Sequence, residues 1–86
     1  MLTGKTALVT GSTSGIGLGI AQALAAQGAN IILNGFGETE GPIAAVRQAA
    51  GQRAIQVEYH GADMSKADEI AAMMAFAAER FGRVDI

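Results

Sequence analysis

Short apolar runs alternate with helical segments along the whole sequence. Three of these runs have the length and the Val, Ile and Thr content of strands, and they cover residues 5–10, 30–34 and 54–59. Helical periodicity, closed each time by a glycine, predicts helices at residues 15–27, 42–50 and 65–81. Residues 83–86, RVDI, are predicted to open a fourth strand. Because parallel strands need such crossover helices, the sequence predicts an α/β fold built on half of a doubly wound parallel sheet.

Each predicted helix has an apolar face that we expect to pack against the sheet. In the first helix this face comprises Ile16, Ile20, Ala23 and Leu24. In the third helix it comprises Ile70, Met73, Met74, Ala77 and Phe81. We expect Pro42 to occupy the first position of the second helix and Ser65 to cap the third.

The turn after the first predicted strand, TGSTSGIG at residues 10–17, is rich in glycine. Glycine loses more backbone freedom on folding than other residues, so this composition needs a reason. A diphosphate at a helix N-terminus is stabilised by unpaired N–H groups and by the helix dipole, provided that no Cβ holds the backbone away. We expect Gly11 to turn the chain, Gly15 to admit the phosphates and Gly17 to bring the helix close to the sheet.

Hydroxyl groups stand between these glycines. Thr13 and Ser14 can hydrogen-bond a phosphate or a ribose, and Ser12 can tie the loop together. The glycine spacing is GxxxGxG, which differs from the common dinucleotide fingerprint GxGxxG, and the lysine of a P-loop is absent. A turn that only connects and packs is the alternative. The position of the turn favours a dinucleotide site in a partial NAD(P)-binding Rossmann domain that covers residues 1–86.

The composition argues against several other classes of function. The net charge of −2 and the lack of a basic cluster disfavour nucleic acid and anionic membranes as partners. The sequence has no cysteine, no signal-peptide pattern and no apolar stretch near the ~20 residues of a membrane span, so we expect a cytoplasmic protein. The only histidine, His60, is expected to face solvent and not to bind a metal.

Several segments resemble the short-chain dehydrogenase/reductase family. TGSTSGIG at 10–17 is similar to the family's cofactor motif TGxxxGIG, and MLTGK at 1–5, NGFG at 34–37, GADMS at 61–65 and RVDI at 83–86 are also similar. The resemblance implies an oxidoreductase that transfers a hydride between a nicotinamide cofactor and a small molecule. Within the family the sequence is most similar to bacterial NAD-dependent D-3-hydroxybutyrate dehydrogenases, which implies a small 3-hydroxy acid as substrate.

The resemblance also implies which residues hold the cofactor. Around the diphosphate and the adjoining ribose it places Gly11, Thr13, Gly15, Ile16 and Gly17. Asp63 would accept a hydrogen bond from the adenine amino group, and Met64 would lie beside the adenine ring. In the alternative interpretation, Asp63 is only a surface residue that caps the helix ahead of Ser65.

The choice between NAD and NADP depends on the end of the second strand, where an acid favours NAD and a basic residue favours NADP. The stretch NGFGETE at 34–40 has neither charge at the strand end itself. No Lys or Arg occurs in residues 6–46, Glu38 and Glu40 would repel a phosphate, and Phe36 can cover the ribose. We therefore expect NAD, and an NADP-dependent 3-ketoacyl reductase is the alternative.

No catalytic residue is expected in this sequence. The resemblance implies that a catalytic Ser, Tyr and Lys, and an Asn that relays a proton, lie beyond Ile86. Tyr59, the only tyrosine, is not part of a YxxxK motif because Asp63 stands where the lysine would be. We therefore expect the N-terminal portion of a longer, homo-oligomeric and tetrameric enzyme that has no turnover by itself. A stand-alone nucleotide-binding module is the alternative.

Overall fold

Residues 2–86 are described by the computed structural model, so Met1 of the MLTGK segment lies outside the described residues. Within them strands and helices alternate in the order β1 (Thr6–Val9), α1 (Gly15–Ala26), β2 (Asn30–Leu33), α2 (Glu40–Ala50), β3 (Val57–Tyr59) and α3 (Ala67–Phe81). The strands form one parallel sheet in the order β1-β2-β3. The predicted α/β fold with a parallel sheet is confirmed.

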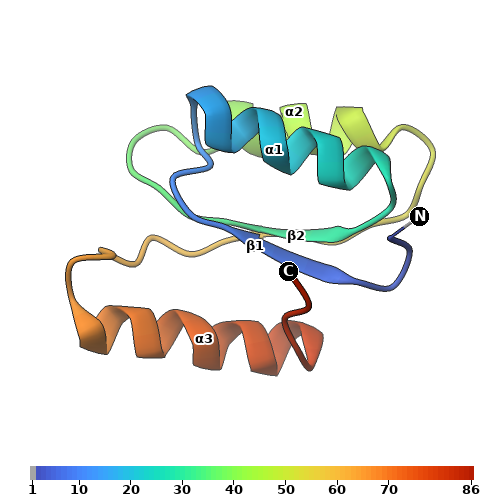
Figure 1. Ribbon diagram of the computed structural model, residues 1–86. Coiled ribbons are helices and arrows are strands. Elements are labelled where there is room, and N and C mark those ends of the chain that lie inside the picture. Colours follow the sequence, from blue (N-terminus) through green and yellow to red (C-terminus); the bar gives the residue numbers. More distant parts are fainter. Residues whose placement is uncertain (1) are drawn as a thin grey trace.

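Helices cover both faces of the sheet, with α1 and α2 on one face and α3 on the other (Figure 1). Residues 85 and 86 explain this arrangement, because they hydrogen-bond the edge of β1 that is opposite to the edge paired with β2. The N–H of Leu8 donates to the carbonyl oxygen of Ile86 at 3.0 Å, and the N–H of Asp85 donates to that of Thr6 at 2.8 Å. The winding thus reverses after β3, and a right-handed crossover places α3 on the opposite face. Residues 84–86 are not a regular strand, but they lie where the predicted fourth strand would begin.

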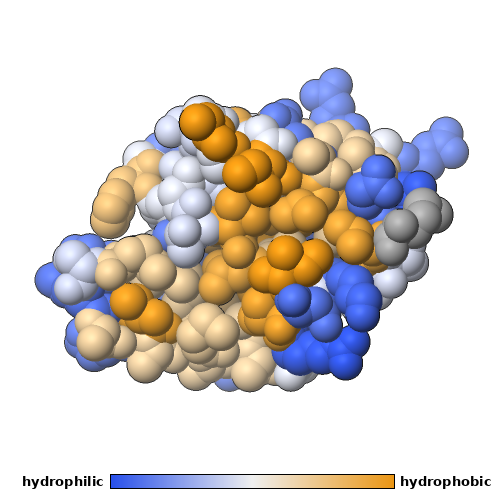
Figure 2. All heavy atoms as spheres, viewed as in Figure 1, coloured by the Kyte–Doolittle hydropathy of each residue, from blue (hydrophilic) through white to orange (hydrophobic). Residues whose placement is uncertain are grey.

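Hydrophobic residues gather over the middle of the face seen in Figure 2, between α1 and α3. Several large hydrophobic side chains of the protein are exposed, and they include Ile16, Ile20 and Ile86. An exposed apolar surface of this kind is typical of a region that another element covers.

Helices α2 and α3 begin at residues other than those predicted. α2 starts at Glu40, so Pro42 is its third residue. The missing N–H of Pro42 is harmless there because the N–H groups of a first turn have no partner within the helix. The N-cap of α3 is Lys66 and not Ser65, whose hydroxyl hydrogen-bonds the Asp63 carboxylate.

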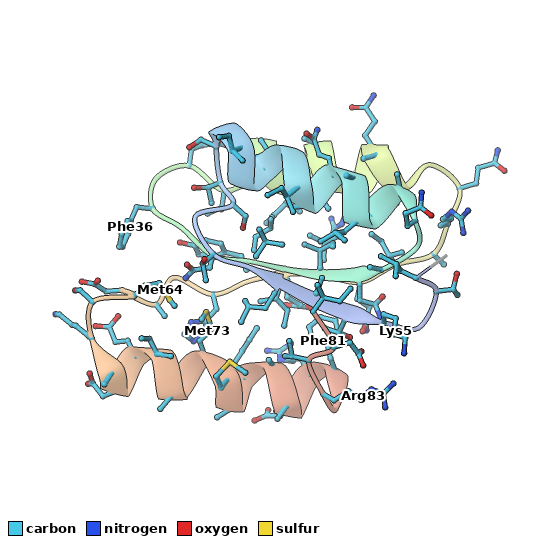
Figure 3. All side chains as sticks on the ribbon, in the orientation of Figure 1. Lys5, Phe36, Met64, Met73, Phe81 and Arg83 are labelled. Carbon is cyan, nitrogen blue, oxygen red and sulfur yellow. The ribbon has the colours of Figure 1, made fainter. Side chains whose placement is uncertain are left out.

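The apolar face of α3 largely agrees with the prediction. Met73 and Ala77 are buried, and Met73 and Phe81 point toward the sheet in Figure 3. Met74 is 43% exposed, contrary to the prediction, because the helix turns by about 100° between neighbouring residues. Within residues 2–86, even this longest helix lacks the length and hydrophobicity needed to cross a membrane.

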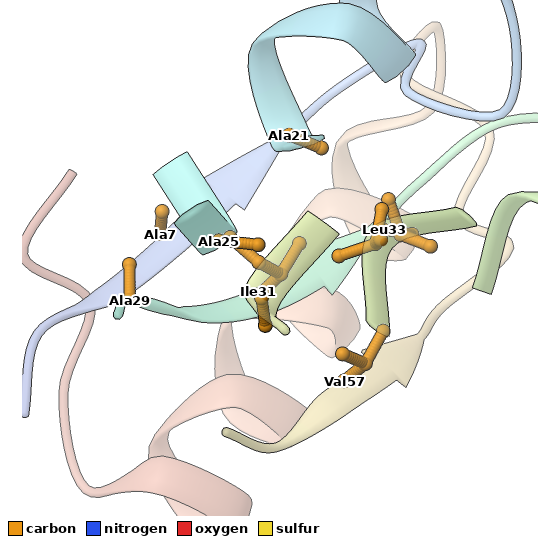
Figure 4. Close-up of a cluster of buried hydrophobic side chains, with 9 residues drawn as sticks. Ala7, Ala21, Ala25, Ala29, Ile31, Leu33 and Val57 are labelled. Carbon is orange, nitrogen blue, oxygen red and sulfur yellow. The ribbon is translucent and has the colours of Figure 1, made fainter. Parts of the chain in front are cut away.

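The largest hydrophobic cluster lies between the sheet and helices α1 and α2 (Figure 4). Its fully buried members include Ala21 and Ala25 of α1, Ile31 and Leu33 of β2, and Val46 of α2. Because the α1 residues in this cluster are alanines, the helix backbone can lie close to the sheet and to α2.

The inward face of α1 differs from the prediction. Ile16 is 84% exposed and Ile20 is 48% exposed, and Ala23 is exposed as well. Of the predicted face only Leu24 packs against the cluster, beside the two buried alanines. The rotation of the helix follows from a close backbone contact at Gly17, described below, which brings the smallest side chains inward.

Candidate functional site

The loops that follow the three strands meet at the carboxyl edge of the sheet, where they enclose a cleft of about 400 Å³. The cleft is lined by Gly11, Thr13, Ser14, Asn34, Gly35, Phe36, Ala62, Asp63, Met64 and Ser65. Phe36 and Met64 lie at the same end of the molecule, on the loops after β2 and β3 (Figure 3). Parallel strands bring residues that are distant in sequence together here, since all their carboxyl ends share one edge.

Five of the eight predicted site residues line this cleft, namely Gly11, Thr13, Phe36, Asp63 and Met64. The other three, at positions 15–17, lie in the first turn of α1 and do not line it. The interpretation of the sequence missed Asn34, Gly35, Ala62 and Ser65 as lining residues. For Asn34 and Gly35 the available signal was their position directly after the buried strand β2.

The glycines of the first loop meet different structural requirements. Gly11 and Gly15 both have φ of +60°, which disfavours other residues, and a Cβ on either would meet open space. A Cβ on Gly17 would collide with the carbonyl oxygen of Gly11 and come within 2.8 Å of its carbonyl carbon. Gly17 therefore allows α1 to press against the loop that precedes it.

The N-terminus of α1 points its backbone N–H groups out of the helix without a capping side chain. Ser14 occupies the N-cap position but makes no side-chain capping bond within the described residues. The first turn carries no acidic residue, and Ile16 is almost fully exposed. These N–H groups and the helix dipole are therefore available to an anion.

Asn34 joins all three loops of the site. It is buried, and its main-chain N–H donates to Ser12 Oγ at 2.9 Å. Its side-chain amide donates to the carbonyl oxygens of His60 and Ala62, both at 3.0 Å. The predicted role of Ser12 in tying the loop is confirmed, because its N–H also donates to the Asn34 carbonyl oxygen at 2.6 Å.

A second set of bonds holds the loop after β2. The hydroxyl of Thr13 donates to the carbonyl oxygen of Phe36 at 3.0 Å. The hydroxyl of Tyr59 donates to the carbonyl oxygen of Gly35 at 2.5 Å. The Phe36 ring itself is 72% exposed, so its backbone is fixed while its side chain stands free at the mouth of the cleft.

The Asp63 carboxylate is oriented by Ser65. Its Oδ1 accepts hydrogen bonds from the Ser65 hydroxyl at 2.6 Å and from the Ser65 N–H at 2.9 Å. The hydroxyl bond, and then the backbone bond, hold the pKa of Asp63 below its ordinary value, so the carboxylate is charged at neutral pH. Within residues 2–86 the second oxygen has no hydrogen-bond partner and can accept a donor from a ligand.

His60 does not face solvent as predicted. It is half-buried, its ring packs on Phe76 with centroids 5.1 Å apart, and its Nδ1 is buried without a partner among the described residues. The imidazole is shielded from solvent because the ring of Phe76, in the helix α3, packs on it. His60 does not line the cleft. No group of three or more His, Cys, Asp or Glu side chains suited to a metal occurs in residues 2–86.

The fold and the glycine-rich loop of this chain are those of a known protein family. The family model described as short chain dehydrogenase matches residues 5–86. The chain belongs to the short-chain dehydrogenase family. The resemblance inferred from TGSTSGIG is therefore confirmed, and this family is one of oxidoreductases.

Curated relatives in this family are similar over the full length of the chain. A D-beta-hydroxybutyrate dehydrogenase of Cupriavidus necator is 66% identical over 100% of this chain and 33% of its own length. A D-beta-hydroxybutyrate dehydrogenase of Rhizobium meliloti is 55% identical over 95% of this chain and 32% of its own length. The chain thus spans about a third of the length of these short-chain dehydrogenases.

Solved short-chain dehydrogenase structures share the fold. A metagenomic short-chain oxidoreductase in complex with NADP is 33% identical, with a TM-score of 0.81 over 99% of this chain and 38% of its own. A 3-oxoacyl-[acyl-carrier protein] reductase from Brucella melitensis in complex with NAD is 32% identical, with a TM-score of 0.82 over 94% of this chain and 30% of its own. The fold is therefore the N-terminal half of a Rossmann fold, and such neighbours bind either nicotinamide dinucleotide.

Proposed function

We propose that residues 1–86 are the NAD-binding part of an oxidoreductase that acts on D-3-hydroxybutyrate or a similar small 3-hydroxy acid. The observation that carries the proposal is the 66% identity to a D-beta-hydroxybutyrate dehydrogenase over the whole chain, glycine loop and cleft included. When bound, the cofactor accepts a hydride from the hydroxyl-bearing carbon of the substrate. The residues of this chain bind and orient the cofactor.

The donors beside the cleft, at the start of α1, suit the diphosphate of a dinucleotide. Unpaired N–H groups at the start of α1 supply donors and the positive end of a dipole. Gly11 and Gly15 leave open space where a Cβ would stand, so a phosphate can approach the backbone closely. Both glycines and the residues Ile16 and Gly17 of the first turn are thus proposed to hold the diphosphate, with Thr13 near the adjoining ribose.

The far end of the cleft fits an adenosine. We expect Oδ2 of Asp63 to accept a hydrogen bond from the adenine amino group, since Oδ1 already accepts two hydrogen bonds from Ser65. Met64 and Phe36, which are 41% and 72% exposed, offer apolar surface to the adenine and its ribose. Flat, apolar rings are commonly held between such side chains.

The charges near the loop after β2 favour NAD over NADP. Glu38 accepts a hydrogen bond from the Gly41 N–H at 2.6 Å, which keeps its carboxylate at the loop. No lysine or arginine occurs in residues 6–46, so a 2′-phosphate there would meet negative charge and no cation.

The chemistry itself is proposed to belong to the part of the protein beyond this chain. The only tyrosine, Tyr59, is hydrogen-bonded to Gly35 and does not line the cleft. The exposed Ile16, Ile20 and Ile86 favour a longer protein whose further residues cover these side chains. We expect that protein to be a cytoplasmic homo-oligomer whose catalytic Ser, Tyr and Lys act on the substrate.

The test uses the full-length protein that contains this chain. Absorbance at the NADH band follows oxidation of D-3-hydroxybutyrate with NAD and, separately, with NADP. We expect turnover with NAD and much slower turnover with NADP. Reduction of an acetoacetyl thioester with NADPH, without oxidation of hydroxybutyrate, would contradict the proposal. That outcome would favour a ketoacyl reductase, the activity named for the similar Brucella structure.

A further inference from the structure

The segment Gly35–Gly37 after β2 is held by two hydroxyl groups from different parts of the chain. Tyr59, the last residue of β3, donates to the Gly35 carbonyl oxygen at 2.5 Å. Thr13, in the loop before α1, donates to the next carbonyl oxygen, that of Phe36, at 3.0 Å. Two successive peptide groups at the mouth of the cleft are therefore oriented by side chains outside their own loop.

These bonds restrain a segment that has little rigidity of its own. Gly35 has φ of +158° and Gly37 has φ of +92°, and glycine at both positions permits many other backbone shapes. In a trans peptide the C=O and the following N–H point in opposite directions. The Tyr59 bond to the Gly35 carbonyl therefore also fixes the direction of the Phe36 N–H.

A 2′-phosphate needs cations or converging hydrogen-bond donors around it. Proteins bind phosphate with cationic side chains or with successive backbone N–H groups that converge on it. The segment has no cation, and Glu38 adds a negative charge beside it. A change in the direction of the Phe36 N–H requires the Gly35–Phe36 peptide to rotate, and that rotation breaks the Tyr59 bond.

We propose that Tyr59 is a positioning residue that sets the preference for NAD over NADP by holding the Gly35–Gly37 segment against the rearrangement that a 2′-phosphate, with no cation in this segment, would need. This inference rests on the proposed cofactor site. Tyr59 does not line the cleft, so it would act on the cofactor only through Gly35.

Gly61 offers a second way to disturb the same bond. A Cβ on Gly61 would lie 3.0 Å from the Tyr59 hydroxyl oxygen and 3.5 Å from two carbons of its ring. The φ of Gly61 lies outside the left-handed region, so alanine is compatible with its backbone. Gly61→Ala therefore displaces the Tyr59 hydroxyl without removing it.

The experiment measures the dissociation constants of NAD and NADP by calorimetry with full-length wild-type, Tyr59→Phe and Gly61→Ala proteins. For Tyr59→Phe we expect the ratio of the NADP constant to the NAD constant to fall about fivefold, which corresponds to one hydrogen bond of about 1 kcal/mol. Gly61→Ala should lower the ratio in the same direction.

Ser65→Ala is the matched control, because it also removes one hydroxyl bond at the cleft rim. That bond supports Asp63 on the adenine side, which NAD and NADP share, so both constants should change alike and the ratio should stay constant. If Tyr59→Phe does not fold by circular dichroism, Gly61→Ala decides the matter. An unchanged ratio in every folded variant of Tyr59 and Gly61 overturns the inference. The wild-type ratio tests the proposed preference for NAD separately, since it does not depend on any variant.

Discussion

Ser12 and Asn34 are hydrogen-bonded to each other: the Ser12 N–H donates to the Asn34 carbonyl oxygen at 2.6 Å, and the Asn34 N–H donates to the side-chain oxygen Oγ of Ser12 at 2.9 Å. This pair joins the first two loops of the site, and the Asn34 amide reaches the third loop. The shape of the cleft therefore depends on one buried asparagine at the end of β2.

Replacement of that asparagine is expected to weaken the fold and the site together. In Asn34→Ala the carbonyl groups of His60 and Ala62 lose their donor, which should lower the free energy of unfolding by about 2–3 kcal/mol. Asn30→Ala is the matched control at the other end of β2, where an exposed side-chain oxygen accepts one bond from Gln56. That control should lose about 0.5–1 kcal/mol. Urea unfolding of the full-length variants measures both, and equal losses would contradict the role given to Asn34.

Two glycines on neighbouring turns of α1 should respond oppositely to alanine. Gly17→Ala places a Cβ against the Gly11 carbonyl and is expected to destabilise the protein by about 1–3 kcal/mol. Gly19→Ala meets open space within a helix and should stabilise it by up to about 1 kcal/mol. Thermal or urea unfolding distinguishes the two, and a stabilising Gly17→Ala would show that the close approach of helix and loop is absent.

The Ser65 bonds to Asp63 give the site a defined response to acid. Because the pKa of Asp63 is lower in the folded protein than its ordinary value of 3.8, the stabilisation is present above that value and is lost as the pH falls through the folded pKa. Ser65→Ala removes the hydroxyl bond and should raise the pKa of Asp63 toward its ordinary value. An NMR titration of the Asp63 carboxyl carbon measures this, and an unchanged pKa would contradict the assigned cause.

The order of the elements could be predicted from the sequence because its signals are local. Glycines at helix ends and apolar runs of strand length depend only on neighbouring residues, as with Gly51 after α2 and Gly82 after α3. The inward face of α1 could not be predicted in this way. Hydrophobicity predicts that Ile16 and Ile20 face the sheet. The close contact between Gly17 and the Gly11 backbone instead turns the alanines of α1 toward the sheet.

Five of the predicted residues line the candidate cleft, whereas the sequence did not indicate most of the residues that support it. The glycines and Asp63 belong to a motif, so their positions were visible in the sequence. The partners of Asn34 and Tyr59 lie 22 to 28 residues away, and nothing local indicates that Asn34 reaches Ala62 or that Tyr59 reaches Gly35. The burial of the His60 ring beneath Phe76 depends likewise on a helix that follows it.

The central claim is that the loop TGSTSGIG binds the diphosphate of NAD, and calorimetric titration of NAD into full-length Gly15→Val tests it most directly. Gly51→Val is the control, since Gly51 has φ of +64° against +60° for Gly15, and both have open space for a Cβ. Both variants therefore place a side chain on a backbone with positive φ, and only Gly15 lies where the phosphates would approach. We expect Gly15→Val to lose at least about tenfold in NAD affinity, or about 1.4 kcal/mol, while Gly51→Val binds as the wild type does. A folded Gly15→Val protein with unchanged NAD affinity would contradict the claim.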